Sequence, residues 1–255
     1  MNLKALGSSS SGNCFVMTFD MGEGRPPTSL MVECGFPYRT IVEKCTRNGI
    51  GIGDIQACLI THCHLDHSKA AVDLAKRGIP ICATKGTLEA LGIRGWRLDY
   101  GTPAMVAHNV AAMSFRVNHD APEPAGFVIK TPRETVMFAI DSNEWLDDIT
   151  AIAPDYLFIE ANYDPTLMEQ EQFSLRRHGG LKEMNRWNVN ERIKASHMSI
   201  DNTLVTISKI DKSRLKTIFL THLSDRMSAP QYWKTLVKQL TGIPCIVCRK
   251  DEGLE

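Results

Sequence analysis

Three histidines and one aspartate fall within six consecutive residues, His62-Cys63-His64-Leu65-Asp66-His67, directly after the apolar run Ala57–Thr61. Alternate residues of an extended segment share a face, so His62 and His64 can bind one metal ion. Asp66 and His67 stand at the turn into a helix expected from Ser68, where they can bind a second ion. Ordinary surface histidines do not explain this density. The sequence therefore predicts a metal site at the end of a buried strand.

The composition is that of a globular chain. Of its 255 residues 43% are hydrophobic, and 29 Lys plus Arg balance 29 Asp plus Glu. These values exclude a disordered chain, a collagen-like repeat and a coiled coil. A net charge of zero argues against a generally basic nucleic-acid binder, so contact with a polyanion has to come from a local patch.

From the sequence we expect neither a membrane span nor an export signal. No stretch reaches the roughly eighteen apolar residues of a membrane span, and the first twenty residues do not resemble a secretory signal. The eight cysteines lie mostly in apolar runs, which is typical of buried reduced thiols. We expect a cytoplasmic protein. Cys245 and Cys248 have the spacing of a metal or redox pair, but no second pair accompanies them, which favours a plain strand over Ile243–Cys248.

Strand-like runs dominate the first half, and strands alternate with helical patterns later. We expect strands at Leu3–Leu6, Cys14–Phe19, Leu30–Cys34, Ala57–Thr61, Ile79–Ala83, Met105–Val117, Phe127–Lys130, Thr135–Ile140, Tyr156–Glu160, Thr217–Thr221 and Ile243–Cys248. Helices are expected at Tyr38–Asn48, Ser68–Arg77, Lys85–Leu91, Lys182–Lys194, Asn202–Ile210 and Pro230–Leu240. The mixture indicates two mostly β layers covered by helices. Since no long linker interrupts the pattern, one domain over residues 1–255 is predicted.

The HxHxDH motif resembles that of the metallo-β-lactamase superfamily, which implies a four-layer αββα fold. The resemblance implies a further histidine, an aspartate and a final histidine, each at the end of a strand. His119, Asp141 and His222 each follow an apolar, strand-like run and match this pattern. It then implies one site of His62, His64 and His119 and a second of Asp66, His67 and His222, with Asp141 in both.

Further motifs narrow the resemblance to the phosphodiesterase branch. The segments 7–13, 119–122, 158–164, 196–199 and 221–224 look like the YycJ-type enzymes, regarded as DNA exonucleases, and the last three also look like ribonuclease Z. Only 55 residues separate Asp141 from His197, which leaves no room for the inserted domain of the β-CASP nucleases. Only 21 separate His119 from Asp141, which leaves no room for the tRNA-gripping arm expected of ribonuclease Z.

The residue types of these sites suit a particular chemistry. Imidazole and carboxylate ligands favour Zn²⁺ or Mn²⁺. Two such ions, roughly 3.5–4 Å apart, acidify a bridging water and stabilise charge on the attacking and leaving oxygens of an in-line displacement. The leaving alkoxide then needs a proton, for which His197 with Glu160 as its partner is the candidate. The alternative for His197 is a turn before a helix that Ser199 or Asp201 caps.

Three other features have two interpretations each. The polar segment 7–13 is a phosphate-binding loop or a simple hairpin turn. The basic stretch from Arg176 through Lys194 is a phosphate-steering patch or a solvated helix face. Trp96, Tyr100 and Trp187 are core or subunit-interface residues, which leaves a homodimer open, or residues that stack on bases.

The sequence predicts a dinuclear metal-dependent hydrolase that acts as a phosphodiesterase, first of all a DNA exonuclease. The alternative is a small-substrate hydrolase on the same fold, first a cyclic-nucleotide phosphodiesterase and then a thioester or lactone hydrolase. The neutral charge, and the lack of any segment that reads as a nucleic-acid arm, support this alternative. A non-catalytic binding module is disfavoured because every expected ligand is present.

Overall fold

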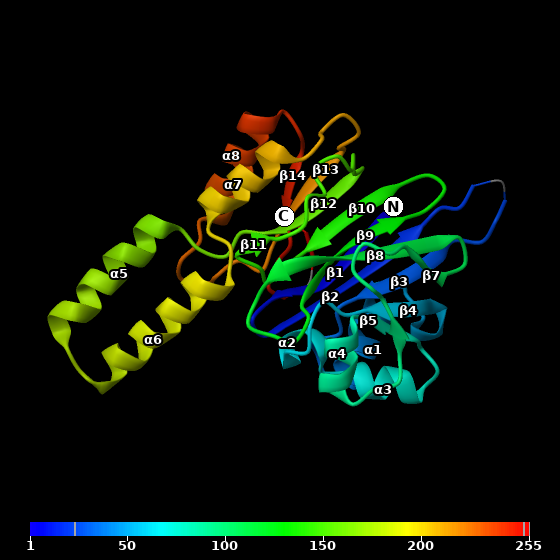
Figure 1. Ribbon diagram of the computed structural model, residues 1–255, viewed down its shortest axis with the longest axis horizontal. Helices are drawn as coiled ribbons and strands as arrows, with labels where there is room; N and C mark the ends of the chain where they lie inside the picture. The colour runs from blue at the N-terminus through cyan, green and yellow to red at the C-terminus, as the bar shows by residue number, and fades with distance from the viewer. Residues whose placement is uncertain (23, 252, 255) are drawn as a thin grey trace.

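A computed structural model describes residues 1–22, 24–251 and 253–254. Two β-sheets pack against each other, and helices cover the outer face of each sheet (Figure 1). In the described part of the chain no helix has the length and apolar character that crossing a bilayer requires.

The first sheet contains six strands from the N-terminal part of the chain. Their order is β1 (Asn2–Ser9), β2 (Gly12–Phe19), β3 (Thr28–Val32), β4 (Ile55–Leu59), β5 (Ile81–Ala83) and β6 (Trp96–Arg97). The first three are antiparallel and the rest parallel. Parallel neighbours need crossovers, which here carry α1 (Tyr38–Arg47), the 3₁₀ turn η1 (Ile52–Asp54), α2 (Leu65–Ser68), α3 (Ala71–Lys76) and α4 (Lys85–Leu91).

The second sheet contains eight strands. Its main order is β11 (Glu144–Trp145), β8 (Val110–Asn118), β9 (Ala125–Lys130), β10 (Thr135–Ala139), β12 (Tyr156–Glu160), β13 (Thr217–Thr221) and β14 (Cys245–Val247), while β7 (Ala104–Ala107) pairs with β8. The strands β10, β12, β13 and β14 run parallel. Their connections carry α5 (Pro165–His178), α6 (Leu181–Ser196), α7 (Ile200–Lys209) and α8 (Pro230–Thr241).

Aromatic side chains fill the space between the sheets. Phe15 of β2 makes edge contacts with Phe138 and Phe158 at centroid distances of 5.4 and 6.0 Å, and Phe158 stacks on Phe219 at 4.3 Å. Such rings bury a large apolar area, so they join the two sheets into one inner core.

Two further apolar clusters join the helices to the outer faces. Ile41, Leu74 and Leu88 of α1, α3 and α4 pack against the first sheet. Ile207, Trp233 and Val237 of α7 and α8 pack against the second. The layer order is therefore helix, sheet, sheet, helix, which confirms the predicted αββα fold class.

The helices α5 and α6 form a hairpin that projects from the body, and we call residues 165–196 the arm (Figure 1). The sequence analysis expected a helix over Lys182–Lys194, which lies within α6, but it expected no helix over α5. Asp164 accepts hydrogen bonds from the backbone N–H groups of Thr166 and Leu167, and Pro165 occupies the first turn. This cap is a known helix start, yet α5 has no one-sided apolar pattern that would reveal it.

Three local expectations need correction. The run Met105–Val117 is two strands, because Asn109 adopts a left-handed φ of 57° and turns β7 into β8. The helix expected over Ser68–Arg77 is split into α2 and α3. Trp96 has half of its surface exposed and is not a core residue. By contrast, the thiols of Cys245 and Cys248 are buried and unpaired, as a plain strand requires.

Candidate metal centre

The predicted ligands meet at one edge of the two sheets, where four strands end. His62 follows β4, His119 follows β8, Asp141 follows β10 and His222 follows β13. Asp141 and His222 adopt left-handed φ values of 51° and 53°. This conformation costs an L-residue roughly 1 kcal/mol or more, and such strain clusters at functional sites.

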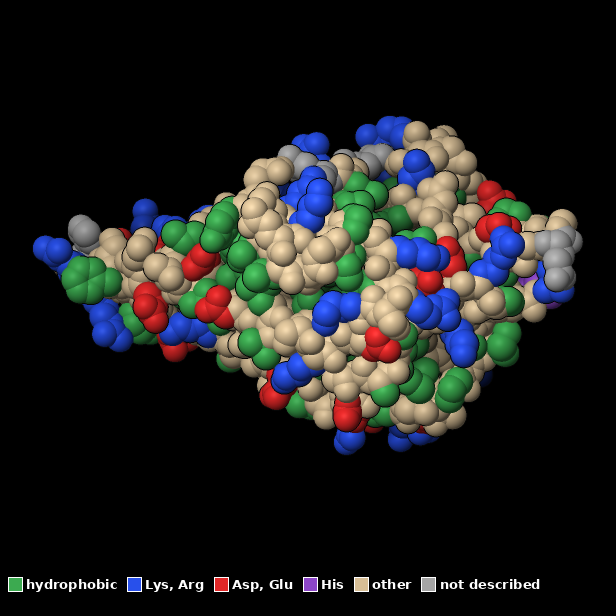
Figure 2. All heavy atoms as spheres, turned by 90° about the horizontal axis from the view of Figure 1, so that it is seen from above, with side chains coloured by type: hydrophobic (Ala, Val, Ile, Leu, Met, Phe, Trp, Pro, Cys, Tyr) green, Lys and Arg blue, Asp and Glu red, His purple; other side chains and the backbone are tan. Residues whose placement is uncertain are grey.

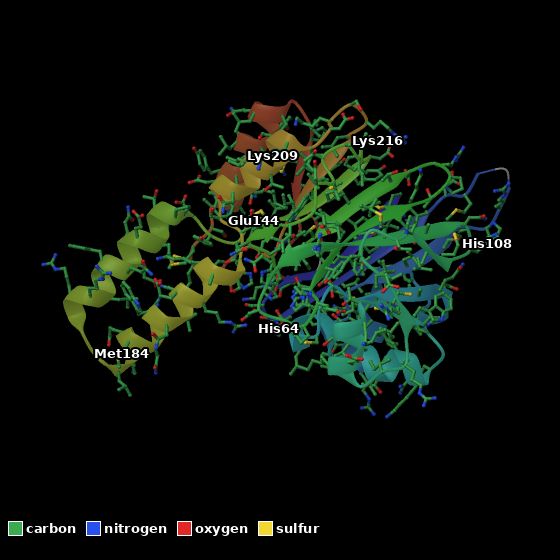
Figure 3. The ribbon with its side chains drawn as sticks, in the orientation of Figure 1. His64, His108, Glu144, Met184, Lys209 and Lys216 are labelled. Carbon is green, nitrogen blue, oxygen red and sulfur yellow. The ribbon has the colours of Figure 1, made fainter. Side chains whose placement is uncertain are left out.

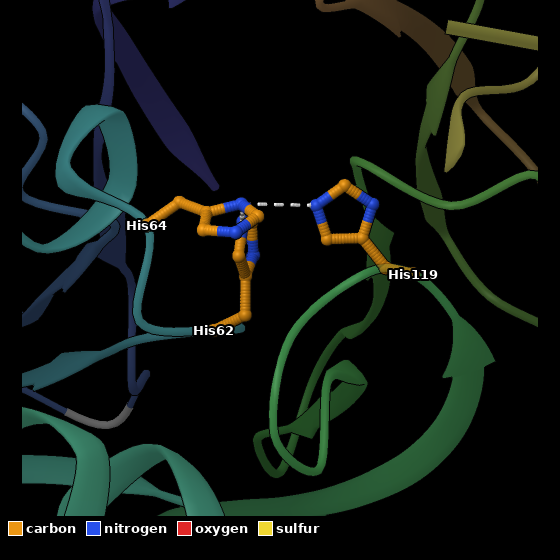
Figure 4. A group of neighbouring side chains, drawn as sticks. All are labelled: His62, His64 and His119. Carbon is orange, nitrogen blue, oxygen red and sulfur yellow. Dashed lines mark hydrogen bonds between the residues drawn. The ribbon is translucent and has the colours of Figure 1, made fainter. Parts of the chain in front are cut away.

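The first group of ligands is a triangle of imidazoles (Figure 4). Nε2 of His62 lies 3.1 Å from Nδ1 of His64, which lies 3.2 Å from Nε2 of His119. Burial lowers the pKa of His62 well below its usual value, and the positive charge of neighbouring imidazoles adds to that. Burial also lowers the pKa of His119. Neutral rings that turn nitrogen lone pairs to one point are what a divalent cation binds.

Hydrogen bonds outside this group orient two of its rings. The Nδ1–H of His119 donates to the Ser196 carbonyl at 2.9 Å, which leaves Nε2 free to act as a ligand. Nδ1 of His62 lies 3.0 Å from the Thr61 hydroxyl. Outer partners of this kind select the tautomer of a metal-binding histidine.

The second group consists of Asp66, His67, Asp141 and His222. Nε2 of His67 lies 3.0 Å from Oδ2 of Asp141 and 3.4 Å from Oδ2 of Asp66. Nδ1 of His222 lies 3.1 Å from Oδ1 of Asp141. Burial alone lowers a histidine pKa, but the Asp141 and Asp66 carboxylates outweigh it and raise the pKa of His222 to about 10.

The Asp141 carboxylate reaches both groups. Its Oδ2 atom also lies 4.0 Å from Nε2 of His62 and 4.0 Å from Nε2 of His119. Burial raises the pKa of Asp141, but His222 and His67 outweigh burial and hold it well below its usual range. An ionised, buried carboxylate thus separates two sets of nitrogen ligands.

These donors fit divalent metal ions. Nε2 of His222 is one of the buried polar atoms that have no hydrogen-bond partner in the described part of the chain. A buried polar atom left unpaired costs free energy, and a bound cation removes that cost. The cluster therefore suits divalent metal binding, as the sequence predicted.

His197 and Glu160 stand beside the second group. Nδ1 of His197 lies 2.6 Å from Oε1 of Glu160, and the His197 ring stacks on His222 at 5.1 Å. Burial lowers the pKa of His197, but Glu160 outweighs it and the net shift is upward. Backbone N–H groups of Ser142 and Met198 donate to Oε2 of Glu160 and fix the carboxylate.

The two interpretations of the segment after α6 are compatible. The Ser199 hydroxyl accepts the N–H of Asn202 and caps α7. His197, two residues earlier, still turns its ring into the site.

Four residues support the ligands through hydrogen bonds or close contacts, a role that the sequence analysis did not give them. The buried Glu33 accepts the N–H of Thr61 at 3.2 Å, and its other oxygen lies 3.6 Å from Nδ1 of His67. Like the ligands, it directly follows a buried strand, β3, whereas the sequence analysis placed it inside the strand expected over Leu30–Cys34. The Ser8 hydroxyl accepts a hydrogen bond from the backbone N–H of His222, and the Asn162 amide donates to the backbone carbonyl of His222. The Asn13 amide donates to the backbone carbonyl of Asp66.

An open pocket of about 500 Å³ lies over the ligands. Its wall includes Ser10 from the β1–β2 turn, Val189 and Arg192 from α6, and Ser224 and Arg226 from the loop after β13. The segment 7–13 is thus a hairpin turn whose tip also borders the site.

The chain belongs to the beta-lactamase superfamily, because the model of the beta-lactamase superfamily domain matches residues 31–222. Among curated proteins, the exodeoxyribonuclease YycJ of Bacillus anthracis is 22% identical over 237 residues, which cover 88% of this chain and 83% of that protein.

Solved structures agree on the fold. The metallo-β-lactamase fold protein YhfI from Bacillus subtilis aligns with a TM-score of 0.70 and 15% identity, over 99% of this chain and 98% of that one. The short form of human tRNase Z aligns with a TM-score of 0.59 and 17% identity, over 89% and 94%. These structures confirm the fold, while the family match and the curated exodeoxyribonuclease confirm the resemblance to this superfamily and support the prediction of a hydrolase.

Proposed function

We propose that this protein is a dinuclear metal-dependent phosphodiesterase that degrades DNA as an exonuclease. One observation carries the proposal: the Asp141 carboxylate lies between a group of three imidazoles and a group with His67, His222 and Asp66. A carboxylate in this place can be a ligand of two ions at once.

The residues divide into two ligand sets. His62, His64 and His119 would hold the first ion, and Asp66, His67 and His222 would hold the second, with Asp141 as a ligand available to both. We propose Zn²⁺ or Mn²⁺, since mixed imidazole and carboxylate ligands suit both metals. Two bound ions supply Lewis acidity and a water of lowered pKa for attack on phosphorus.

The protein's own part is to position groups and to supply a proton. The Glu160 carboxylate raises the pKa of His197, which favours the protonated ring, and orients this ring through Nδ1. Nε2–H of His197 is then free to protonate the leaving alkoxide. Arg192 and Arg226 line the pocket wall, where each also pairs with a carboxylate, Asp120 and Glu171, and they are the side chains there that can contact an anionic backbone.

The choice of DNA rests on the resemblance to YycJ of Bacillus anthracis, an exodeoxyribonuclease, along 88% of this chain. Cyclic-nucleotide, thioester and lactone hydrolysis are the competing outcomes. The experiment measures turnover of single-stranded DNA and of cyclic mononucleotides with Mn²⁺ and with Zn²⁺. Mononucleotides released from DNA are expected, and DNA left intact with both metals contradicts the proposal.

Asp66→Ala tests the dinuclear mechanism. The variant removes one ligand of the second site and is expected to abolish turnover and reduce bound metal. Asp73→Ala, on the exposed face of α3, is the matched control and keeps full activity. Unchanged activity in Asp66→Ala means that the mechanism is wrong.

A further inference from the structure

The arm places a second set of side chains beyond the pocket. Its helix α6 has 16 residues and is therefore about 24 Å long. His64 lies at the edge of the body near the base of the arm, and Met184 lies at the far end (Figure 3). Arg192 joins the base to the body through Asp120 at 2.9 Å.

The contact between the two helices of the arm is largely polar. The Gln172 amide donates to Glu191 at 2.5 Å, the Asn190 amide donates to Glu171 at 2.7 Å, and Lys194 donates to Gln172 at 3.1 Å. Met168 and Ile193 add an apolar contact. Three other large apolar side chains are exposed, with exposed fractions of 63% for Phe173, 76% for Leu181 and 59% for Met184. Because helices of globular proteins usually bury their apolar side chains, these exposed side chains indicate that the surface of the arm contacts another molecule.

Positive charge collects near the turn of the arm. Glu171 is already paired with Arg186 and Arg226, and Glu191 with Lys194. Arg176, Arg177 and Lys182, which flank the turn, form no ion pair with a carboxylate in the described part of the chain. Lys and Arg side chains lie on the protruding end of the molecule, interspersed with Asp and Glu side chains (Figure 2). A polyanion complements this surface, whereas a second copy of the same surface repels it.

Two of these cations lie over aromatic rings. The Arg176 guanidinium is 4.6 Å from the centroid of the Trp187 ring, and that of Arg177 is 5.7 Å from the Phe173 ring. Proteins that bind unpaired strands combine such cations with rings on which bases stack. Phe173 and Trp187 therefore favour a strand with accessible bases over a duplex.

A second hollow connects the pocket with the arm. Arg226 borders both the pocket over the ligands and this hollow, which Arg186 and Glu171, the carboxylate that pairs with both arginines, also line. From His197 back to Lys182 is fifteen residues, or about 22 Å of helix. At 3.4 Å per stacked nucleotide this length holds about six nucleotides.

We propose that the arm binds an unpaired nucleic-acid strand whose end lies in the pocket. The proposal rests on the function proposed above and adds the form of the substrate: a single strand that extends about six nucleotides from the scissile bond.

The experiment compares the wild type with the triple variant Arg176→Gln, Arg177→Gln and Lys182→Gln. Fluorescence anisotropy follows the binding of a labelled twelve-residue oligothymidylate at several salt concentrations. Each lost phosphate contact changes the log–log salt slope by about 0.7 for a single strand, so we expect the slope to fall by about 2 and Kd to rise about 100-fold at 0.1 M salt. Turnover of bis(p-nitrophenyl) phosphate, which is too short to reach the arm, stays unchanged.

The matched control removes three exposed cations from the helices of the other outer layer, Arg39→Gln, Lys76→Gln and Lys85→Gln. It is expected to bind like the wild type. Phe173→Ala tests the preference for an unpaired strand. It is expected to weaken the affinity for oligothymidylate at least about fivefold without weakening the affinity for a blunt duplex. An equal loss of affinity for both nucleic acids overturns that preference.

The arm proposal is overturned if the wild-type protein does not bind the oligonucleotide, or if the triple variant binds it as well as the control variant does. It is also overturned if the triple substitution changes only the oligomeric state, as measured by sedimentation, and not the binding. Failure of the proposed function is a separate result. Oligonucleotide that is bound through the arm and not hydrolysed supports the arm and contradicts the exonuclease.

Discussion

The proposed proton transfer by His197 can be tested through the leaving group. His197→Ala removes an acid that contributes about 10²- to 10⁴-fold when the leaving group is an alkoxide. Hydrolysis of DNA is expected to slow by about that factor. Thymidine 5′-(p-nitrophenyl phosphate), whose nitrophenolate departs without a proton, is expected to lose less than tenfold.

The contact with Glu160 sets the size of a second effect. The distance of 2.6 Å between Nδ1 of His197 and a fully buried carboxylate describes a charge-assisted hydrogen bond, worth about 1.5–3 kcal/mol. Because 1.36 kcal/mol corresponds to one pKa unit, Glu160→Gln is expected to lower the pKa of His197 by about 1–2 units. The basic limb of the kcat profile on DNA then moves to lower pH by the same amount.

The assay measures kcat on both substrates from pH 6 to 10, with the metal content of each variant determined alongside. Ser199→Ala is the control, since it removes the cap of α7, costs about 1 kcal/mol of stability and leaves both rates unchanged. An equal loss on both substrates in His197→Ala, or a basic limb that Glu160→Gln does not move, refutes the role of this pair.

Two further predictions concern residues away from the proton transfer. Glu33→Gln removes the charge next to Nδ1 of His67 and is expected to weaken metal affinity about 10- to 100-fold, as measured by chelator competition; unchanged affinity contradicts a supporting role. Burial raises the pKa of Asp155, but the N–H of Thr135 and the cations of Lys216 and Arg214 outweigh it and lower the pKa. Since a lowered folded-state pKa stabilises only above the unfolded value near 3.9, the destabilisation by Asp155→Asn in urea unfolding is expected to be largest at pH 7 and to shrink as the pH falls below 4. A difference that stays constant with pH contradicts this account.

The sequence predicts the ligand edge well because strand ends and ligands coincide along the chain. His62, His119, Asp141 and His222 each follow an apolar run, and the ends of such strands meet at one edge of a sheet. The HxHxDH motif and this rule of strand ends therefore identified residues up to 160 positions apart as neighbours in the fold. The prediction of one domain over residues 1–255 and the prediction of a homodimer stay predictions.

What escaped prediction depends on contacts that carry no local pattern. The arm packs through Gln172, Asn190 and Glu171, so neither helix shows a continuous apolar stripe and α5 went unrecognised. Glu33 belongs to no quoted motif, although its place after β3 matches that of the ligands. Side chains that act through hydrogen bonds to distant partners are visible only once the chain is folded.

Metal stoichiometry tests the central claim most directly. Metal-stripped protein is titrated with Zn²⁺ or Mn²⁺ while bound metal and hydrolysis of single-stranded DNA are followed together. The account predicts two ions per chain, with hydrolysis appearing as the second ion binds. Full hydrolysis with one ion per chain, or in the presence of excess chelator, would contradict it.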